Sequence, residues 1–340
     1  MTSMRYRTAL VGCGRIGVTM EEDPRRVSPA THAGAYQACP RTELVAVMDV
    51  DADRVDHAAR LFHGVRGFTS VDALLDAIRP DIVSIATPPV QHRAGVEACA
   101  RRGVRAVVCE KPIADSLDDA RAMIEACANS HTLLLINHTR RFDPALRQLR
   151  DQIAAGALGD ITQATAYYTA GVFNSGTHMV DLMRFFLGDA AWVVAVGNPK
   201  ATCPPGDFSA DALLGFTSGA RAVLQVQEVK DYAIFTLRLH GRSGTAVIDR
   251  FGFEVERTSV RDCAEFSGYR ELDTRSARRD GEARSFMAGL VDHAVACLDG
   301  RERSVSCGED GLAALEILLA IKASAGAGGS PVALQPRGNP

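Results

Sequence analysis

The 340-residue sequence lacks the features that mark membrane, secreted and metal-binding proteins. Its nine cysteines form no Cys-x-x-Cys pair and no tight cluster with histidine, which argues against structural zinc and a disulfide framework. Every apolar run falls short of the roughly 18 residues that span a bilayer, and Met1-Thr2-Ser3-Met4-Arg5 leads into a predicted strand without a signal-peptide core. We therefore expect a cytoplasmic protein with reduced cysteines and no metal site.

An excess of charge of one sign is also missing. Lys and Arg number 38 against 41 Asp and Glu, and the two signs are interspersed along the chain. This distribution gives no basic footprint for nucleic acid or for an acidic membrane surface. The length and the 46% hydrophobic content allow two domains with cores of their own. We therefore expect no nucleic-acid or membrane partner.

The first part of the chain alternates short apolar runs with segments of helical periodicity. Strands are expected at 8–11, 44–48, 82–86, 106–109 and 133–136. Helices are expected at 71–78, 93–102 and 117–128. This alternation predicts an α/β domain, a parallel, doubly wound sheet with crossover helices on both faces, over residues 1–136.

The rest of the chain, 137–340, has a different pattern. A helix is expected at 144–155, and two closing helices at 283–298 and 308–323. Strands are expected at 161–168, 192–196, 213–216, 222–226 and 235–240. Several are joined by short turns, so we expect an α+β domain whose open-faced sheet is largely antiparallel.

A glycine-rich turn directly follows the first predicted strand. It contains Gly12, Gly14 and Gly17, with Arg15 and Ile16 before the last glycine. Such a turn lets backbone N–H groups and a helix N-terminus approach a dinucleotide pyrophosphate. Alone the pattern is weak evidence for a dinucleotide, because a tight strand-to-helix turn without a ligand can have the same glycine spacing.

An acidic residue at the end of the second predicted strand supports a dinucleotide. Asp49 stands where a carboxylate binds both ribose hydroxyls and repels a 2′-phosphate, and Val50 offers no cation, so NAD is favoured over NADP. The alternative is that Asp49 only forms a turn. The separation of Gly17 and Asp49 exceeds the usual spacing of about 20 residues. The extra segment, 18–31, is charged and contains two prolines, which predicts either a lid over the cofactor or a solvated loop. His32 is interpreted as a helix-start residue.

Two further motifs follow central strands, at the sheet edge where ligands bind. The first contains Thr87, Pro88 and His92, and the second contains Glu110 and Lys111. Lysine is scarce, with four against 34 arginines. A partly desolvated ammonium at residue 111 could hold the oxygen that becomes a carbonyl. The alternative is a surface lysine paired with its acidic neighbour.

With these motifs the chain resembles the Gfo/Idh/MocA family of oxidoreductases over nearly its whole length. The matching motifs, in the family's order, are the glycine turn, Thr87-Pro88-Pro89, Glu110-Lys111-Pro112, Arg141-Phe142-x-Pro144, Gly156-x-Leu158-Gly159 and Gly176-x-His178-x-x-Asp181. The resemblance implies an N-terminal Rossmann domain, a C-terminal open-faced sheet domain and a nicotinamide cofactor. It also implies substrates that are mostly sugars, cyclitols or nucleotide-linked sugars, and assembly through the open sheets as a homodimer or homotetramer.

The resemblance also assigns catalytic roles. Lys111 matches the family's active-site lysine and His178 its active-site histidine. We expect His178 in the first turn of a helix that begins at Thr177, where the positive helix end favours a neutral imidazole, with Asp181 on the same face to orient it. The alternative is a structural histidine that caps the helix. Many members carry an aspartate where this chain has Asn174. Because an asparagine cannot take a proton, the role of general base shifts to His178 or Lys111.

Thr177 and the pair Arg140 and Arg141 are further candidates for substrate binding. Each guanidinium could clamp a phosphate, a carboxylate or the cofactor's amide edge, and the alternative is a salt bridge between domains. We expect an NAD(P)-dependent oxidoreductase that moves a hydride between the nicotinamide and a secondary alcohol or ketone of a sugar, cyclitol or nucleotide-linked amino sugar. The alternatives are a glycosidase- or epimerase-like enzyme with transient NAD redox recycling and an inactive cofactor-binding regulator.

Overall fold

The computed structural model describes residues 5–335, which form two compact units. Unit 1 comprises residues up to 142 together with 284–312, and unit 2 comprises 143–283 and the residues from 313 onward. This differs from the expected division at 136/137, because residues 284–312 return to unit 1. The physical reason is α8 (Phe286–Leu298), whose buried apolar side chains join the core of unit 1.

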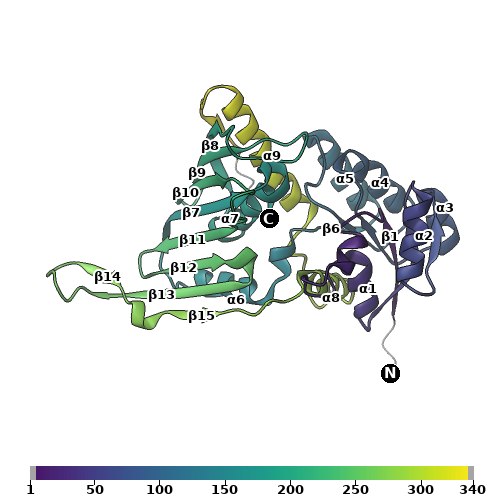
Figure 1. Cartoon of the computed structure of the whole chain (residues 1–340), viewed down its shortest axis with the longest axis horizontal. Helices are drawn as coiled ribbons and strands as arrows, with labels where there is room; N and C mark the ends of the chain where they lie inside the picture. The colour runs from purple at the N-terminus through teal and green to yellow at the C-terminus, as the bar shows by residue number, and fades with distance from the viewer. Residues whose placement is uncertain (1–4, 336–340) are drawn as a thin grey trace. The chain divides into compact units, whose positions relative to one another are not determined.

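Unit 1 is built on a six-stranded parallel sheet (Figure 1). Its order is β3-β2-β1-β4-β5-β6, and all neighbours are parallel. The strands are β1 (Tyr6–Val11), β2 (Thr42–Met48), β3 (Arg66–Phe68), β4 (Ile82–Ile85), β5 (Ala106–Cys109) and β6 (Leu133–Ile136). The order reverses between β1 and β4, where doubly wound sheets bind ligands. Only β3 escapes the sequence prediction, because its three residues are exposed or half-buried.

With one exception, the helices of unit 1 begin at polar residues whose side chains cap the first turn. They are α1 (His32–Ala38), α2 (Ala52–Leu61), α3 (Val71–Ile78), α4 (His92–Arg101), α5 (Leu117–Asn129) and α8. The exception is α4, which has no side-chain cap. The side chains of Ser70 and Ser116 accept hydrogen bonds from the first turns of α3 and α5. Such caps satisfy amides that have no partner inside the helix.

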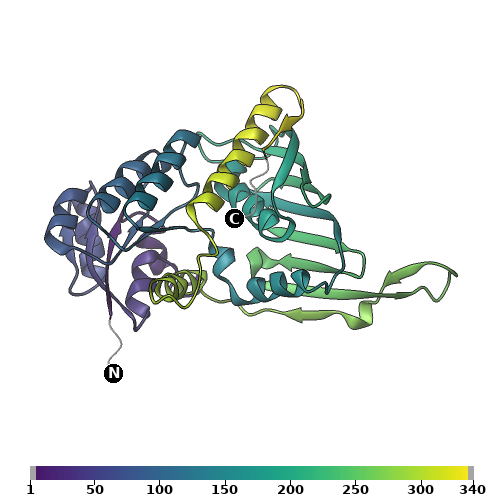
Figure 2. The ribbon, with the colours of Figure 1, turned by 180° about the vertical axis from the view of Figure 1, so that it is seen from behind.

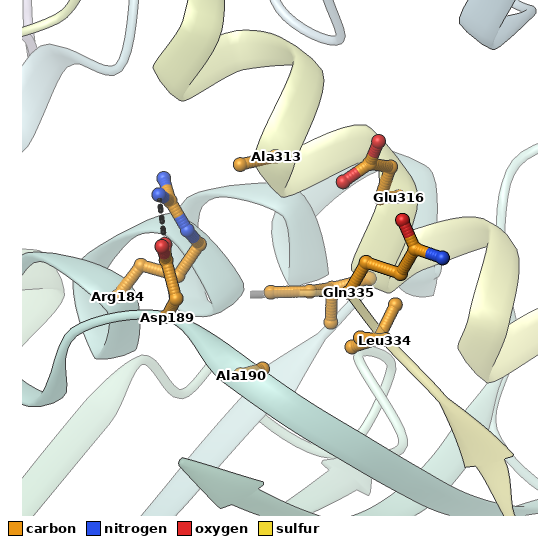
Figure 3. A pocket seen from close by; sticks show the side chains of 8 residues that line it. Arg184, Asp189, Ala190, Ala313, Glu316, Leu334 and Gln335 are labelled. Carbon is orange, nitrogen blue, oxygen red and sulfur yellow. Dashed lines mark hydrogen bonds and ion pairs between the residues drawn. The ribbon is translucent and has the colours of Figure 1, made fainter. Parts of the chain in front are cut away.

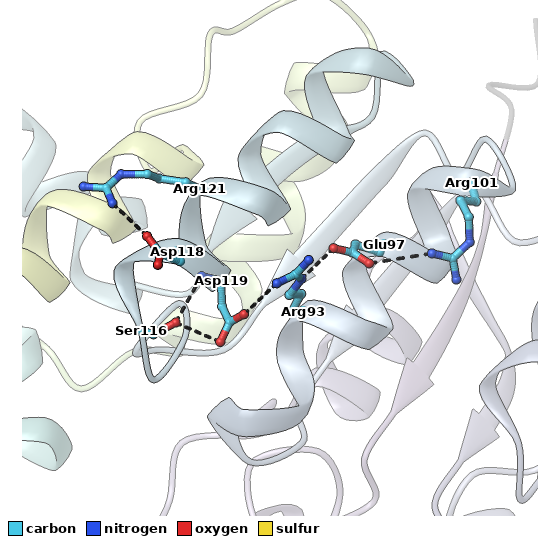
Figure 4. A network of polar contacts seen from close by, with 7 residues as sticks. All are labelled: Arg93, Glu97, Arg101, Ser116, Asp118, Asp119 and Arg121. Atoms are coloured by element: carbon cyan, nitrogen blue, oxygen red, sulfur yellow. Dashed lines mark hydrogen bonds and ion pairs between the residues drawn. The ribbon is translucent and has the colours of Figure 1, made fainter.

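The exposed faces of α4 and α5 are joined by ion pairs (Figure 4). Arg93 on α4 contacts Glu97 at 2.7 Å and Asp119 on α5 at 2.9 Å. These side chains are solvent-accessible, so each pair adds little stability. The network contains none of the predicted site residues and serves to hold two crossover helices side by side.

The first crossover helix is interrupted by the segment 18–31. The backbone N–H of His32 donates to the carbonyl of Ile16 at 3.1 Å, and that of Ala33 donates to Gly17 at the same distance. These are the partners that residues 20 and 21 would have in an uninterrupted α-helix. The chain therefore leaves the helix after its first turn and rejoins it in register at α1.

Glu21 ties this excursion down. Its carboxylate accepts hydrogen bonds from the Ser28 hydroxyl, from the backbone of Ala30 and from the backbone and side chain of Thr31. Thr31 in turn caps α1 by accepting from Gly34. The structure therefore shows a folded excursion with internal hydrogen bonds and not a loose solvated loop; whether it covers a cofactor stays a prediction.

Unit 2 is built on a ten-stranded, largely antiparallel sheet, as expected. Its strands are β7 (Ile161–Thr169), β8 (Ala190–Gly197), β9 (Ala210–Phe216), β10 (Arg221–Gln227), β11 (Thr236–Gly241), β12 (Gly244–Asp249), β13 (Glu254–Asp262), β14 (Arg270–Leu272), β15 (Arg278–Asp280) and β16 (Val332–Ala333). β7 and β10 pair in parallel, and the other recorded pairs in this sheet are antiparallel. β13 and β14 extend beyond the rest of the sheet as a hairpin arm (Figures 1 and 2).

One face of this sheet is covered by α6 (Pro144–Ala154), α7 (Thr177–Leu187) and part of α9 (Gly308–Gly326). The strands alternate buried and exposed residues, which is the pattern of a sheet with one packed face. On the other face, Leu213 and the paired Val223 are each 37% exposed. The helices in the described range, 5–335, include none long and apolar enough to cross a membrane.

Candidate functional site

The glycine turn after β1 is shaped by two close backbone approaches. Gly12 has a φ of +102°, and a Cβ there would lie 2.7 Å from the backbone of Ala86. A Cβ on Gly17 would collide with the Gly12 carbonyl oxygen, whereas one on Gly14 would meet nothing within 4 Å. Two glycines are therefore required by the fold, and Gly14 leaves open space where a ligand can approach the backbone.

Asp49 at the end of β2 is 7% exposed and holds this turn in place. Its Oδ2 accepts from the backbone N–H of Cys13 at 2.8 Å, and its Oδ1 accepts from that of Asp51 at 3.1 Å. A carboxylate oxygen accepts more than one hydrogen bond, so capacity remains for ribose hydroxyls. Burial and the nearby Asp49 raise the pKa of the Cys13 thiol to about 12, which makes it a small apolar filler.

Three polar residues follow three neighbouring strands at the carboxyl edge of the sheet. Thr87 comes after β4, Glu110 after β5 and Asn137 after β6. Glu110 Oε1 accepts from Asn137 Nδ2 at 2.5 Å and lies 2.8 Å from Nε2 of His32. Lys111, the next residue after Glu110, is half-buried, and its backbone N–H donates to Glu110 Oε2 at 3.3 Å.

The net effect of these contacts is to keep Glu110 ionised. Burial alone would raise the pKa of its carboxyl group, but the hydrogen bonds from His32 and Asn137 and the positive charge of Lys111 outweigh burial and lower it. A buried, paired carboxylate of this kind holds its neighbours in place.

Sequence reasoning missed how far this buried network extends. His32 Nδ1 lies 2.9 Å from Ser84 Oγ in β4, and Ser84 Oγ lies 2.7 Å from the hydroxyl of Tyr36 in α1. All three side chains are at most 2% exposed. His32 is the first residue of α1, as predicted, but its side chain points to the sheet. The available signal was a serine in the middle of the apolar strand Ile82–Ile85.

His92 was predicted to contact the cofactor, and the structure gives it a supporting position. Its Nε2 lies 2.8 Å from the carbonyl oxygen of Thr87, and its Nδ1 lies 3.1 Å from that of Ile113. Both ring nitrogens thus lie near carbonyl oxygens of the segments that follow β4 and β5. His92 therefore shapes this edge of the sheet, and its contact with the cofactor stays a prediction.

Arg141 is engaged within unit 1. It is 5% exposed, and its Nη1 lies 2.9 Å from Asp310 Oδ1 and donates to the carbonyl of Val305 at 2.9 Å. All these residues belong to unit 1, so the ion pair is internal to that unit and not a bridge between domains. Arg140 stacks its guanidinium 5.7 Å from the ring centre of Phe286. The ion pair compensates the charge of a buried guanidinium, and the clamping of a substrate by Arg140 and Arg141 stays a prediction.

In unit 2, the helix that carries His178 starts earlier than expected. A π-helical turn, Gly171–Gly176, runs directly into α7, so His178 is the eighth residue of a continuous helical run. The charge at a helix start falls off within the first turn, and the expected effect of that charge on His178 does not apply. Asp181 and Thr177 are buried on α7, and Asn174 is exposed in the π-helical turn.

Asp207 caps this helical run. Its Oδ1 accepts from the backbone N–H of Phe173, and its Oδ2 accepts from that of Asn174, both at 2.9 Å. Gly171 has a φ of +90°, and a Cβ there would collide with the Asp207 carboxylate. The N–H groups at the helix start are thus used by the protein itself, and Asp207 fixes the segment that presents Asn174.

Three other features of unit 2 include no predicted site residue. The pocket in Figure 3 lies beside the Arg184–Asp189 ion pair, and a second pocket lies near Asp160 and Arg242. In the hairpin arm, ligand atoms of Cys263, Glu265 and Glu271 lie within 4.8 Å of one another, but Glu271 is paired with Arg261 at 2.5 Å. These groups change none of the assignments above, and the expectation of no metal site stays a prediction.

The residues of unit 1 fit a dinucleotide. The glycine turn leaves open backbone at Gly14, and Asp49 lies beside it. Thr87 Oγ1 and Asn137 Oδ1 are buried and have no hydrogen-bond partner in the described chain. Buried polar atoms normally find partners, so unpartnered ones at the ligand-binding edge of a doubly wound sheet are consistent with a bound polar group.

Comparison with known proteins agrees with this geometry. The model of the oxidoreductase family with an NAD-binding Rossmann fold, GFO/IDH/MocA, matches residues 6–138, and the GFO/IDH/MocA C-terminal domain matches residues 146–247. D-apiose dehydrogenase of Paraburkholderia graminis is 30% identical to this chain, and the matched region covers 66% of this chain and 60% of that relative's length. Inositol 2-dehydrogenase of Rhizobium meliloti is 28% identical over 92% of this chain and 95% of its own.

A solved structure supports the same fold for the whole chain. The WlbA dehydrogenase from Bordetella pertussis, in complex with NADH and UDP-GlcNAcA, aligns with a TM-score of 0.77 at 23% identity, covering 97% of this chain and 99% of that one. The expected fold class and the expected family are both confirmed. The protein belongs to the GFO/IDH/MocA family of oxidoreductases, and its first unit is that family's NAD-binding Rossmann domain.

Proposed function

We propose that the protein is an NAD-dependent dehydrogenase or ketoreductase for a secondary alcohol or ketone of a sugar, cyclitol or nucleotide-linked amino sugar. The observation that carries the proposal is the edge of the unit 1 sheet. A glycine turn and Asp49 form a dinucleotide seat, and Lys111 follows a neighbouring central strand next to a buried carboxylate. The names of the relatives, which include apiose and inositol dehydrogenases, support polyhydroxylated substrates.

We propose that Lys111 and His178 act on the same hydroxyl group. In the oxidative direction, the imidazole of His178 takes the hydroxyl proton and the carbon–oxygen double bond forms. A nicotinamide bound in the unit 1 seat would supply the hydride acceptor for that carbon. The ammonium of Lys111 stabilises the negative charge that develops on the oxygen. Asp181, three residues after His178 on α7, orients the ring, and Asn174 and Thr177 bind substrate hydroxyl groups.

NAD is favoured over NADP for an electrostatic reason. The buried carboxylate of Asp49 lies where the adenosine ribose is expected, and it would repel a 2′-phosphate. Arg54 Nη1 lies 3.9 Å from Asp49 Oδ2, but Arg54 is also 3.5 Å from Asp51. Its charge is therefore partly balanced by these two carboxylates.

Replacement of the two catalytic candidates tests the proposal. Lys111→Met and His178→Ala should each lower turnover by roughly 100-fold or more, because each removes a group that acts in the transition state. Affinity for NAD, measured by calorimetry, should stay close to that of the wild type. Full turnover in either variant with an active substrate would remove that residue from the mechanism.

We also propose a cytoplasmic location and assembly as a homodimer or homotetramer. All nine cysteines are free thiols, as is common in a reducing compartment. The open face of the unit 2 sheet carries exposed Leu213 and Val223, an apolar strip that suits contact with a second copy. Light scattering of the purified protein gives the oligomeric state directly, and a monomer at all concentrations would contradict the assembly.

A further inference from the structure

We propose that His32 is a positioning residue for Lys111 and acts on it through Glu110. The inference rests on the proposed function, since Lys111 must be the group that stabilises the oxyanion. His32 lies 78 positions before Glu110 in the chain, yet the two side chains meet at 2.8 Å in a site where His32 has no exposed surface. The contact therefore joins α1 to the end of β5, directly before the lysine.

The protonation of this pair follows from its neighbours. Glu110 is a carboxylate and only accepts hydrogen bonds, so His32 must donate from Nε2. With His32 neutral, the Tyr36 hydroxyl donates to Ser84 Oγ, and the Ser84 hydroxyl donates to His32 Nδ1. This sequence of donors runs in one direction without conflict and requires a hydrogen on Nε2 of His32.

The network ends inside the protein. Tyr36 has no exposed surface, so the path from Glu110 through His32 and Ser84 leads to no solvent. It therefore cannot carry a catalytic proton in or out. The network instead fixes the Glu110 carboxylate from one side. Asn137, the residue after β6, donates to the same oxygen, Oε1, at 2.5 Å.

The fixed carboxylate has two consequences for Lys111. Its other oxygen, Oε2, accepts a hydrogen bond from the backbone N–H of Lys111 at 3.3 Å, which orients the backbone of Lys111 just after β5. Its negative charge also lies beside the positive charge of Lys111, which lowers the pKa of Glu110 in turn. We assign the oxyanion to Lys111 and the role of general base to His178.

The test compares two replacements of His32 in the full-length enzyme with NAD and an active substrate. His32→Gln retains an amide N–H that can donate to Glu110, whereas His32→Leu removes it. We expect His32→Leu to lower kcat by roughly 10- to 100-fold, because the reacting groups are displaced, with the substrate KM and the NAD dissociation constant within about twofold of the wild type. His32→Gln should restore kcat to within about threefold. Equal kcat values in the two variants would overturn the inference.

A matched control comes from a second buried histidine of unit 1. His293 is 3% exposed, and its ring nitrogens lie 2.9 Å from Glu302, 3.4 Å from Cys297 Sγ and 3.1 Å from the backbone nitrogen of Val305. His293→Leu should lower thermal stability and leave kcat unchanged. If it lowers kcat as much as His32→Leu does, loss of any buried histidine explains the effect and the inference fails.

A measurement on the wild type covers the case in which His32→Leu does not fold. Nitrogen-15 chemical shifts of the His32 ring report its tautomer directly, and we expect hydrogen on Nε2. Hydrogen only on Nδ1 would overturn the inference. Failure of the proposed function looks different, because turnover would then survive Lys111→Met while the His32 tautomer stays as expected.

Discussion

Two glycines of one turn have opposite roles. At Gly12 the positive φ and the Ala86 backbone leave no room for a side chain, whereas Gly14 borders open space. The G-x-G-x-x-G pattern identifies all its glycines as parts of a dinucleotide seat. It does not say which of them the fold requires and which the ligand requires. That distinction depends on the position of the strand end at residue 86, which is a tertiary contact.

Gly12→Ala should destabilise the protein by about 1–3 kcal/mol, because the new Cβ is both strained and in contact with backbone. Gly14→Ala should leave the free energy of unfolding within about 1 kcal/mol of the wild type and lower NAD affinity at least tenfold, since its Cβ enters the space for the pyrophosphate. Urea denaturation and calorimetry measure the two quantities. Unchanged NAD affinity in Gly14→Ala would place the pyrophosphate elsewhere.

Site residues could be predicted from the sequence where they directly follow the end of a strand. Asp49, Thr87 and Glu110 were all found in this way, and the structure places them at the carboxyl edge of the sheet. The ion pair of Arg141 could not be predicted, because an arginine in a motif has the same sequence pattern whether it faces a ligand or a carboxylate of the protein. Asp310, its partner, lies far away in the sequence and gives no local signal.

The first crossover helix and its 14-residue excursion, 18–31, are a single element in space. The carbonyl groups of Ile16 and Gly17 are bonded by His32 and Ala33, so the excursion is inserted into a continuous helix. The sequence predicts the excursion from its length, charge and prolines. It cannot predict the register at which the helix resumes, because that is set by two backbone hydrogen bonds.

Deletion of residues 20–31 should restore the helix. The deletion places His32 four positions after Ile16 and reduces the separation of Gly17 and Asp49 from 32 to 20 positions, the usual spacing of about 20. We expect the shortened protein to unfold cooperatively and to bind NAD. Deletion of 22–31 leaves His32 two positions out of register, and its midpoint of thermal unfolding should be clearly lower. Equal stability of the two deletions would contradict the inserted-helix interpretation.

The π-helical turn before α7 depends on Asp207. Its carboxylate accepts two helix-start N–H groups, and the turn carries Asn174 and leads to His178. Asp207→Ala should cost about 1 kcal/mol of stability, as loss of a helix cap does, and should lower kcat several-fold. NAD affinity should not change, since the dinucleotide seat lies in unit 1. Asp207→Asn, which retains one acceptor, should be milder, and equal loss in both would mean that the charge, not the cap, matters.

For the whole molecule, the fold class and the positions of most strands along the chain could be predicted from the sequence. The unit to which each later segment belongs could not. Closing helices were predicted near 283–298 and 308–323, and the structure assigns the first to unit 1. Its core residues, among them Leu290 and Val291, pack with Leu10 and Phe142 of the Rossmann domain. An amphipathic pattern shows that a helix has an apolar face but not which core receives it.

Unit 1 should therefore need residues 284–312 in order to fold. A fragment ending at 142 exposes the apolar surface that α8 covers, and we expect no cooperative unfolding transition from it. A fragment in which a short glycine- and serine-rich linker joins 142 to 284 should fold and bind NAD, because Phe142 and Gly289 are already in contact. A cooperative, NAD-binding fragment ending at 142 would show that α8 is dispensable.

The most direct test of the account is a single-turnover spectrum. The enzyme is mixed with one equivalent of NAD and a panel of free sugars, cyclitols and nucleotide-linked amino sugars, and absorbance of the reduced nicotinamide is followed in the wild type and in Lys111→Met. We expect reduction with at least one member of the panel in the wild type, and a rate at least 100-fold lower in the variant. Bound NAD that no member of the panel reduces, or reduction at the same rate in both proteins, would contradict the central claim.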